Sequence, residues 1–271
     1  MRTVAVLSLK GGVGKTSLVL GLAGAALTRN IRTLVVDLDP QGNCTATLDP
    51  GATKFTLADV LADPRRSVVK DAIAPSVWGP GLDVLVGGEQ TETQNRPDPD
   101  RSGLRRLGRA LSHLDAITDD PPYRLVLLDC PPSLGQLTRS ALVAADRALL
   151  VTEPTIYAVA GVQRAFEAVQ AERKHNRELQ PLGVVVNRVR VRSSEHQYRI
   201  NELREIFGPL VLSTVLPDRS AVQQAQGAGA PIQRWATPGA REVSVALDVL
   251  LARMLRTSQP RRGTLTDQPQ T

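Results

Sequence analysis

The chain has little cysteine and no long apolar run. Only Cys44 and Cys130 occur in 271 residues, and they form neither a disulfide framework nor a CxxC metal pair. No apolar stretch approaches the roughly 18 to 20 residues that a membrane helix needs. The N-terminal apolar run is too short for a secretory signal. These absences exclude disulfide-rich secreted and transmembrane classes, and we expect a reducing, cytoplasmic location.

Aromatic residues and lysine are also scarce. Aromatic residues make up 3% of the chain, which leaves no stacking platform for reading nucleic-acid bases. Lysine supplies only 5 of the 33 basic residues, and two of the five, Lys10 and Lys15, share one loop. The net charge of +6 and the pI near 9.8 fit two interpretations: a solvated arginine-rich surface, or a polyanion partner such as nucleic acid or a membrane.

Short runs rich in Val and Leu alternate with longer stretches of helical periodicity, as expected of buried parallel strands joined by helices. We predict strands at residues 3–9, 33–38, 82–86, 125–128, 148–152, 182–186 and 210–216. We predict helices at residues 15–29, 103–114, 137–145, 161–177, 195–207 and 242–256. This alternation predicts one α/β domain over residues 1–257, with a mostly parallel central sheet flanked by helices on both faces. Polar composition predicts a surface loop at 89–102 and a disordered tail at 258–271.

Between the first strand and the first helix lies KGGVGKT, residues 10–16. Its glycines allow a tight turn that points successive N–H groups inward, and together with the helix N-terminus these form an anion cradle. Lys15 would then reach the β- and γ-phosphates of a nucleotide, and the Thr16 hydroxyl would contact Mg²⁺. The general phosphate-loop pattern needs a glycine where Leu9 stands, so the match is to a variant. The predicted nucleotide-binding residues here are Gly11, Gly12, Val13, Gly14, Lys15, Thr16 and Ser17.

Acidic and amide side chains follow three other predicted strands. VVDLDPQGN carries Asp37 and Asp39, which strand alternation would put on one face, toward the phosphate site; two acids capping a turn are the alternative. LVLLD ends in Asp129, where an acid near Mg²⁺ is expected. VVVNR ends in Asn187, which can pair with adenine N6 and N7 or can be a solvated loop residue.

The motifs KGGVGKT and DLDPQGN resemble those of the deviant Walker-A ATPases, the ParA/Soj partition proteins and their MinD-like relatives, over about residues 2–256. The resemblance implies a P-loop NTPase domain in which Lys10 crosses a dimer interface to the partner's nucleotide while Lys15 binds its own. Both roles suit a slender stem with a compact charge. It also implies that Asp39 orients the attacking water. The predicted catalytic residues are Lys10, Lys15 and Asp39.

The same resemblance assigns other positions. Asp37 supports the Mg²⁺ and water shell, so the predicted metal-site residues are Thr16, Asp37 and Asp129. Asn187 contacts the adenine, and Pro217 and Asp218 cover its face. The turn CPPSLG after Asp129 senses the γ-phosphate. The segment VTEPTIYAVAGV follows the family pattern only loosely.

The implied function is an ATPase with ATP and Mg²⁺ as cofactors. It would form a homodimer with ATP, bind DNA nonspecifically, and be released by slow hydrolysis that a ParB-like protein or a cargo adaptor stimulates. Such a protein would serve chromosome or plasmid segregation, or cargo positioning, and would be nucleoid-associated. The candidate DNA contacts are Arg188, Arg190, Arg192 and Arg219, although a solvated basic face is an alternative.

Two other functions remain open. A MinD-like positioner would need a membrane anchor, but the helix at 242–256 lacks a lysine-rich face, so we predict that it packs on the core and that no membrane is bound. A P-loop amide ligase of cofactor biosynthesis would need a substrate pocket beside the phosphates. Iron–sulfur relatives are disfavoured because Cys44 and Cys130 lie in separate predicted strand-end loops.

Overall fold

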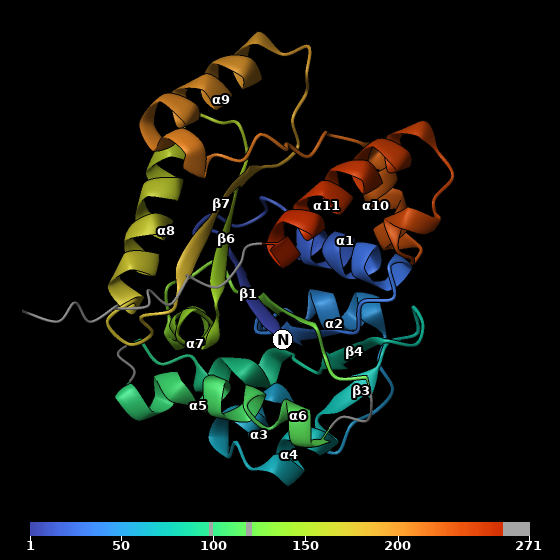
Figure 1. Ribbon diagram of the computed structural model, residues 1–271, viewed down its shortest axis with the longest axis vertical. Helices are drawn as coiled ribbons and strands as arrows, with labels where there is room; N and C mark the ends of the chain where they lie inside the picture. Colours follow the sequence, from blue (N-terminus) through green and yellow to red (C-terminus); the bar gives the residue numbers. More distant parts are fainter. Residues whose placement is uncertain (98–99, 118–120, 257–271) are drawn as a thin grey trace, which may run out of the picture.

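The structure, a computed structural model, describes residues 1–97, 100–117 and 121–256, so the predicted tail at 258–271 lies outside it. Its centre is a sheet of seven strands in the order β3-β4-β2-β5-β1-β6-β7 (Figure 1). Neighbouring strands are parallel except β3, which is antiparallel to β4. The strands are β1 (Arg2–Leu7), β2 (Thr33–Asp37), β3 (Ile73–Pro75), β4 (Leu82–Leu85), β5 (Leu125–Asp129), β6 (Arg147–Thr152) and β7 (Gln180–Val186).

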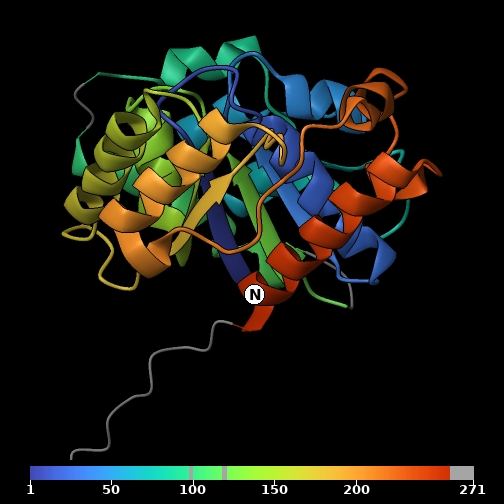
Figure 2. The same cartoon turned by 90° about the horizontal axis from the view of Figure 1, so that it is seen from above.

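Helices cover both faces of the sheet, and each face has its own apolar core (Figures 1 and 2). One face carries α1 (Lys15–Thr28), α2 (Asn43–Leu48), α10 (Ser220–Gly227) and α11 (Pro238–Arg256). The other carries α3 (Leu57–Ala62), α4 (Arg66–Asp71), α5 (Arg101–Leu111), α6 (Leu114–Ile117), α7 (Gln136–Ala144), α8 (Ala158–Glu172) and α9 (Ser194–Phe207). The predicted α/β architecture is therefore confirmed.

Three expectations about single elements are wrong or incomplete. The predicted strand at 210–216 is not a strand. Its first residue belongs to the 3₁₀ helix η2 (Gly208–Leu210), and the segment pairs with β7 and the residues after β7 only through the isolated bridges Val184–Val211 and Val189–Pro217. The predicted loop at 89–102 begins with the 3₁₀ helix η1 (Glu89–Gln94), in which Thr91 is buried. The short elements β3, α2, α3, α4, α10 and η3 (Ile232–Arg234) were not predicted, because elements of three to eight residues show little periodicity.

The C-terminal helix packs on the core, as predicted. Its apolar side chains at Val243, Leu247, Leu251 and Met254 are buried in the same cluster as α1. Within the described ranges, no helix combines the length and the apolar composition that a bilayer crossing requires.

Candidate functional site

The loop between β1 and α1 lies at the carboxyl edge of the sheet. Gly12 and Gly14 have φ values of 79° and 89°, in the left-handed region that favours glycine. A Cβ at Gly14 would also lie 2.3 Å from Asn187 Nδ2, so only glycine fits there. Gly14 caps α1, whose free N–H groups thus face the loop. Lys15 is buried, at 6% exposure, whereas Lys10 is exposed.

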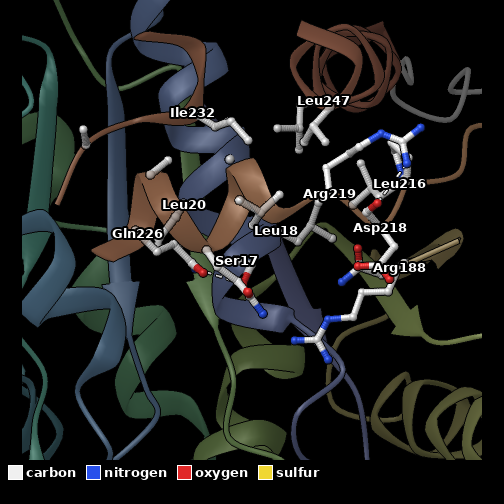
Figure 3. Close-up of a pocket in the computed structure, with 18 of the residues that line it drawn as sticks. Ser17, Leu18, Leu20, Arg188, Leu216, Asp218, Arg219, Gln226, Ile232 and Leu247 are labelled. Atoms are coloured by element: carbon white, nitrogen blue, oxygen red, sulfur yellow. Dashed lines mark hydrogen bonds between the residues drawn. The ribbon is translucent and has the colours of Figure 1, made fainter. Parts of the chain in front are cut away.

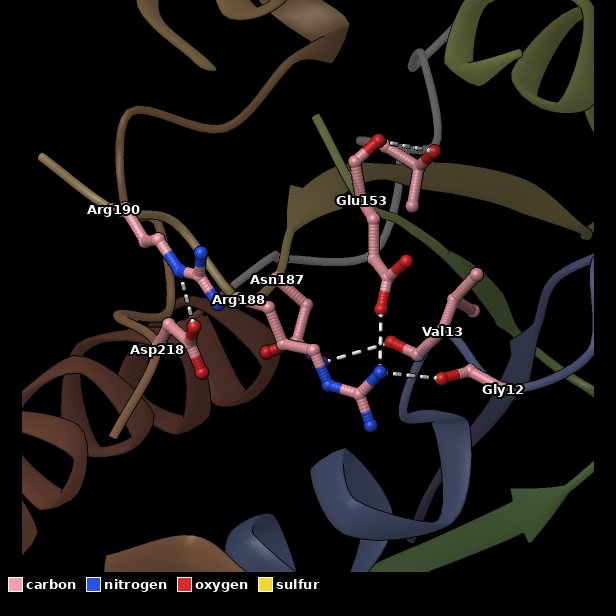
Figure 4. Close-up of polar contacts among 8 residues, drawn as sticks. Gly12, Val13, Glu153, Asn187, Arg188, Arg190 and Asp218 are labelled. Carbon is pink, nitrogen blue, oxygen red and sulfur yellow. Dashed lines mark hydrogen bonds and ion pairs between the residues drawn. The ribbon is translucent and has the colours of Figure 1, made fainter. Parts of the chain in front are cut away.

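Two consecutive side chains after β7 hold two consecutive carbonyls of this loop (Figure 4). Asn187 Nδ2 donates to Val13 O at 2.8 Å, and Arg188 Nη1 donates to Gly12 O at 2.8 Å. The same Arg188 nitrogen lies 2.7 Å from Glu153 Oε1, in the segment after β6. Since the carbonyls are held by this clasp, the N–H groups of the loop are left for an anion.

Asp37 and Asp129 are register neighbours on β2 and β5, so two carboxylates lie side by side at the strand ends. Thr16 Oγ1 donates to Asp129 Oδ2 at 2.7 Å, and the Thr45 backbone N–H donates to Asp37 Oδ2 at 2.7 Å. The second oxygen of each carboxylate is buried and has no hydrogen-bond partner. Sequence reasoning did not foresee this register, because strand pairing is a tertiary property.

Burial makes these carboxylates weak acids. It raises the pKa of Asp129 to about 8, with the neighbouring Asp37 adding to the rise and the Thr16 hydrogen bond and Lys15 opposing it. Burial likewise raises the pKa of Asp37 to about 6, against the hydrogen bonds from Thr45. Two buried carboxylates with unpartnered oxygens and a hydroxyl are the oxygen ligands that a hard divalent cation requires.

The site suits Mg²⁺, which takes some of its ligands from substrate and water, better than a cation that takes all its ligands from the protein. Within the described ranges, no group of three or more His, Cys, Asp and Glu side chains is arranged to hold a metal. Mg²⁺ is bound through one or two carboxylates and takes further ligands from substrate phosphates and water. Thr16, Asp37 and Asp129 would therefore be its protein contacts.

Asp39 lies two residues beyond the end of β2, so its position follows from a turn and not from strand alternation, while its charge acts on both Asp37 and Asp129. β2 ends at Asp37, and Asp39 starts a turn in which its carbonyl accepts from Gly42 N at 2.9 Å. Its Oδ1 accepts from Gln41 N at 3.0 Å. Asp39 still lies near enough to Asp37 to raise the pKa of that carboxyl, after the larger effect of burial.

A pocket beside α1 gathers the residues predicted to contact adenine (Figure 3). Ser17, Asn187, Pro217 and Asp218 line it, and Gln226 Nε2 donates to Ser17 Oγ at 2.9 Å. Its apolar walls include Leu18, Leu20, Leu216, Val222, Ile232 and Leu247. A few polar groups among apolar walls suit a planar heterocycle.

The four candidate DNA arginines do not form one free patch. Arg188 belongs to the clasp on the phosphate loop. Arg190 Nε lies 2.8 Å from Asp218 Oδ2 (Figure 4), and Arg219 Nη2 lies 2.7 Å from Glu242 Oε2. Arg192 is exposed.

Three positions that sequence reasoning missed support the site: Thr45 holds Asp37, Glu153 holds Arg188, and Gln226 holds Ser17. Only Thr45 had a local signal, since it follows the second motif within three residues. Cys44 lies in α2 rather than in a loop. Both cysteines are buried and free, and burial raises the pKa of both thiols, which makes them inert.

The comparisons with known proteins agree with this geometry. A family model described as an AAA domain matches residues 1–181. The chain is 34% identical over 243 residues to the chromosome partitioning protein ParA of Caulobacter vibrioides, covering 86% of each. It is 31% identical over 253 residues to the sporulation initiation inhibitor protein Soj of Bacillus subtilis, covering 92% of this chain and 96% of Soj.

Solved structures share the fold. An ATP complex of McdA from Cyanothece has a TM-score of 0.79 at 22% identity and covers 93% of this chain and 96% of McdA. Cobyrinic acid a,c-diamide synthase from Mycobacterium smegmatis, with a bound ATP analogue and magnesium, has a TM-score of 0.76 at 24% identity, covering 96% and 98%. At such identities the likeness shows the fold alone. The family-model match and the sequence relatives together show that the chain belongs to the AAA-domain family of ParA/Soj partitioning proteins.

Proposed function

We propose that the protein is a Mg²⁺-dependent ATPase that forms a sandwich dimer with ATP, binds DNA nonspecifically as that dimer, and is released by slow hydrolysis. It would thereby serve chromosome or plasmid segregation, or the positioning of another cargo. A ParB-like protein or a cargo adaptor would stimulate the hydrolysis. The family membership and the site geometry support this function.

The observation that carries the proposal is the contrast between the two lysines. Lys15 is buried beside Asp129, where its charge lowers the pKa of that carboxyl against the larger effect of burial. Lys10 lies five residues earlier in the same loop and is exposed. The described residues give its side chain no hydrogen bond or ion pair. Lys15 therefore serves its own site, and Lys10 is free to reach a nucleotide on a second protomer.

Exposed apolar side chains at the carboxyl edge of the sheet, where the phosphate loop also lies, support a face-to-face dimer. Leu134 is 40% exposed in the loop after β5, and Ile156 and Tyr157 are 64% and 70% exposed in the loop after β6. Apolar side chains gathered at one edge indicate a binding surface. A second copy seated there would cover them and would bring its Lys10 to the first protomer's phosphates.

Hydrolysis needs a water held in line with the γ-phosphate. Asp39 is half-buried, its turn is fixed by Gln41 and Gly42, and it stands beside Asp37, so its carboxylate is the group that would orient that water. Mg²⁺, when bound, would neutralise charge on the phosphates. Since Asp39 has one oxygen bonded within its own turn, we expect slow hydrolysis until a partner adjusts the turn.

Lysine substitution tests the proposal directly. With ATP, the wild type should sediment as a dimer and bind DNA. Lys10→Ala should still bind ATP but should remain a monomer that does not bind DNA. Lys174→Ala, which removes another exposed lysine, is the matched control and should behave as the wild type. A Lys10→Ala protein that dimerises normally with ATP contradicts the proposal.

The amide ligase remains a second candidate because a diamide synthase shares the fold. The pocket beside α1 holds the residues predicted to contact adenine, so a ligase would need its acceptor site elsewhere. Small carboxylic acids that accelerate ATP turnover would favour the ligase. A MinD-like membrane cycle is disfavoured because the main apolar stripe of α11 is buried and leaves only Val245 and Val249 as exposed large apolar side chains of that helix among the described residues. Co-sedimentation with anionic liposomes tests it.

A further inference from the structure

Besides the candidate DNA-binding arginines near β7 and α10, a separate basic surface lies on α5, at the opposite end of the molecule from α9 (Figure 1). Arg101, Arg105 and Arg109 recur at every fourth position of the helix, so they follow one face. All three are exposed. The rise of the helix sets successive arginines about 6 Å apart along its axis.

These arginines line a groove between α5 and the end of α3. Ala62, Asp63 and Pro64 contribute the α3 side of the groove. Arg106, which also lines it, is anchored: its Nη1 donates to Leu61 O at 3.0 Å. The anchor holds α5 against α3, so the row of arginines is presented on a rigid element.

The groove carries unbalanced positive charge. Its acid, Asp63, already accepts from Arg65 Nε at 2.6 Å. Among the described residues, no ion pair joins Arg101, Arg105 or Arg109 to an acid. Four arginines of the C-terminal third differ, because Arg188, Arg190, Arg199 and Arg219 are each paired with an acid of the same chain.

The surroundings of the groove favour a phosphate backbone over an acidic protein. Protein-docking sites centre on apolar or aromatic anchors. Among the described residues, no exposed large apolar side chain lies on α3, α4 or α5. Phosphates need no such anchor, since guanidinium groups bind them through bidentate, charge-assisted hydrogen bonds.

Helix α5 and the segment before it also contact the start of α7, which follows the loop after Asp129. Gln136 N donates to Arg96 O at 3.2 Å, in the lead into α5. A Cβ at Gly103, in the first turn of α5, would lie 3.0 Å from Gln136 Nε2. Gln136 opens α7 directly after the turn CPPSLG, so a change in that turn would reach the arginine row through packed contacts.

We propose that the α5 groove is a nucleic-acid surface, in which Arg101, Arg105 and Arg109 bind successive backbone phosphates without reading bases. The inference rests on the proposed function, because it specifies the surface that carries the DNA binding. It moves that binding away from the paired arginines of the C-terminal third.

Three charge-matched variants test the surface. The first replaces Arg101, Arg105 and Arg109 by Gln, which keeps a good helix former and a polar stem. The second replaces Arg190, Arg192 and Arg219 by Gln. The third removes the same charge from scattered exposed positions, with Gln at Arg164, Arg177 and Arg204. Each is titrated with random-sequence duplex DNA and ATP from 50 mM to 300 mM salt, and circular dichroism checks the fold.

The α5 variant should lose roughly a hundredfold in DNA affinity at low salt. The slope of log affinity against log salt should shrink by about 2.7, because each phosphate contact contributes about 0.9. The scattered variant should lose much less. An α5 variant with wild-type affinity and slope overturns the inference, and so does an equal loss in the scattered variant.

Failures of the inference and of the proposed function are distinguishable. If only the Arg190, Arg192 and Arg219 variant loses DNA, the proposed function stands and the α5 surface is wrong. If the wild type ignores DNA in every nucleotide state, both are wrong. In that case, both proteins should be passed over immobilised poly-glutamate. Retention of the wild type but not of the α5 variant would make the groove a docking site for an acidic protein.

Discussion

The phosphate loop and helix α5 both concentrate positive charge, yet they are built in opposite ways. Lys15 is buried beside Asp129, and side-chain hydrogen bonds fix one oxygen of each buried carboxylate and the Val13 carbonyl of the loop. The α5 arginines are exposed, and within the described part of the chain no ion pair joins them to an acid. A buried charge depends on its whole surrounding network, so one change has a large effect. Exposed charges act additively and are screened by salt.

The largest expected effect is the loss of Lys15. Lys15→Ala should weaken ATP binding by at least about a hundredfold, because a preorganised charge aimed at the phosphates disappears from a partly dehydrated site. Lys15→Arg should not rescue binding, since a position with 6% exposure has no room for the wider guanidinium fork. Isothermal titration with ATP and Mg²⁺ measures both. Near-normal ATP binding by the arginine variant would contradict the role given to the compact ammonium.

The second largest effect is expected from replacing a buried carboxylate, which should lower activity but raise stability. Asp129→Asn should abolish Mg²⁺-dependent hydrolysis but raise the free energy of unfolding of the ligand-free protein by about 1 to 3 kcal/mol at pH 7. The asparagine oxygen can still accept the hydrogen bond from Thr16. The wild-type carboxyl, whose pKa is raised to about 8, must take up a proton to fold at pH 7, and the variant avoids this cost.

The pH dependence gives the same prediction a sharper test. The pKa of Asp129 is raised in the folded state to about 8 from 3.8, so the folded protein binds more protons between those values. The wild type therefore loses stability as pH rises through that window, and the variant does not share this loss. Urea denaturation at pH 5.5, 7 and 8.5 should show a growing advantage of the variant. A constant difference would mean that Asp129 is not the titrating group.

Those parts of the site that are encoded locally could be predicted from the sequence. Gly12, Gly14 and Lys15 sit in one loop whose shape follows from glycine conformation and helix start, so the phosphate cradle could be predicted without tertiary contacts. The alternation of strands and helices likewise predicted a mostly parallel sheet. Asp129 was predictable because it ends a continuous apolar strand.

The features of the site that the sequence did not reveal depend on contacts between residues that are far apart along the chain. Register alone makes Asp37 a neighbour of Asp129, and no local pattern reveals register between parallel strands. The acids that neutralise Arg190 and Arg219 stand 28 and 23 residues away. Counting arginines along the sequence therefore could not tell a free basic surface from a paired one.

A medium effect should follow from opening the clasp on the phosphate loop. Arg188→Ala removes the donor to Gly12 O, so the loop loses preorganisation, and ATP affinity should fall about tenfold, or about 1.4 kcal/mol. Glu153→Gln should give a smaller change in the same direction, because it weakens the pair that orients Arg188. Steady-state kinetics should show a raised KM with kcat nearly unchanged.

The control for the clasp is Arg192→Ala, an exposed neighbour for which we expect wild-type kinetics. Arg188→Lys should recover part of the affinity, since an ammonium can donate to Gly12 O without spanning to Glu153 as well. If Arg188→Ala lowers thermal stability but leaves KM unchanged, Arg188 is a packing residue and not a positioning residue for the loop.

The smallest effect is expected on α5 from one arginine alone. Arg105→Gln should weaken DNA binding only a few-fold at 0.1 M salt and lower the salt slope by about 0.9, the value of one phosphate contact. Its unfolding free energy should stay within about 0.5 kcal/mol of the wild type, because the side chain is exposed and is in no ion pair with another described residue. Arg101→Gln and Arg109→Gln should give equal, additive shifts, since independent exposed charges do not share a network. A single substitution that removes all binding would mean that the arginines form one cooperative site, and α5 would then resemble the phosphate loop after all.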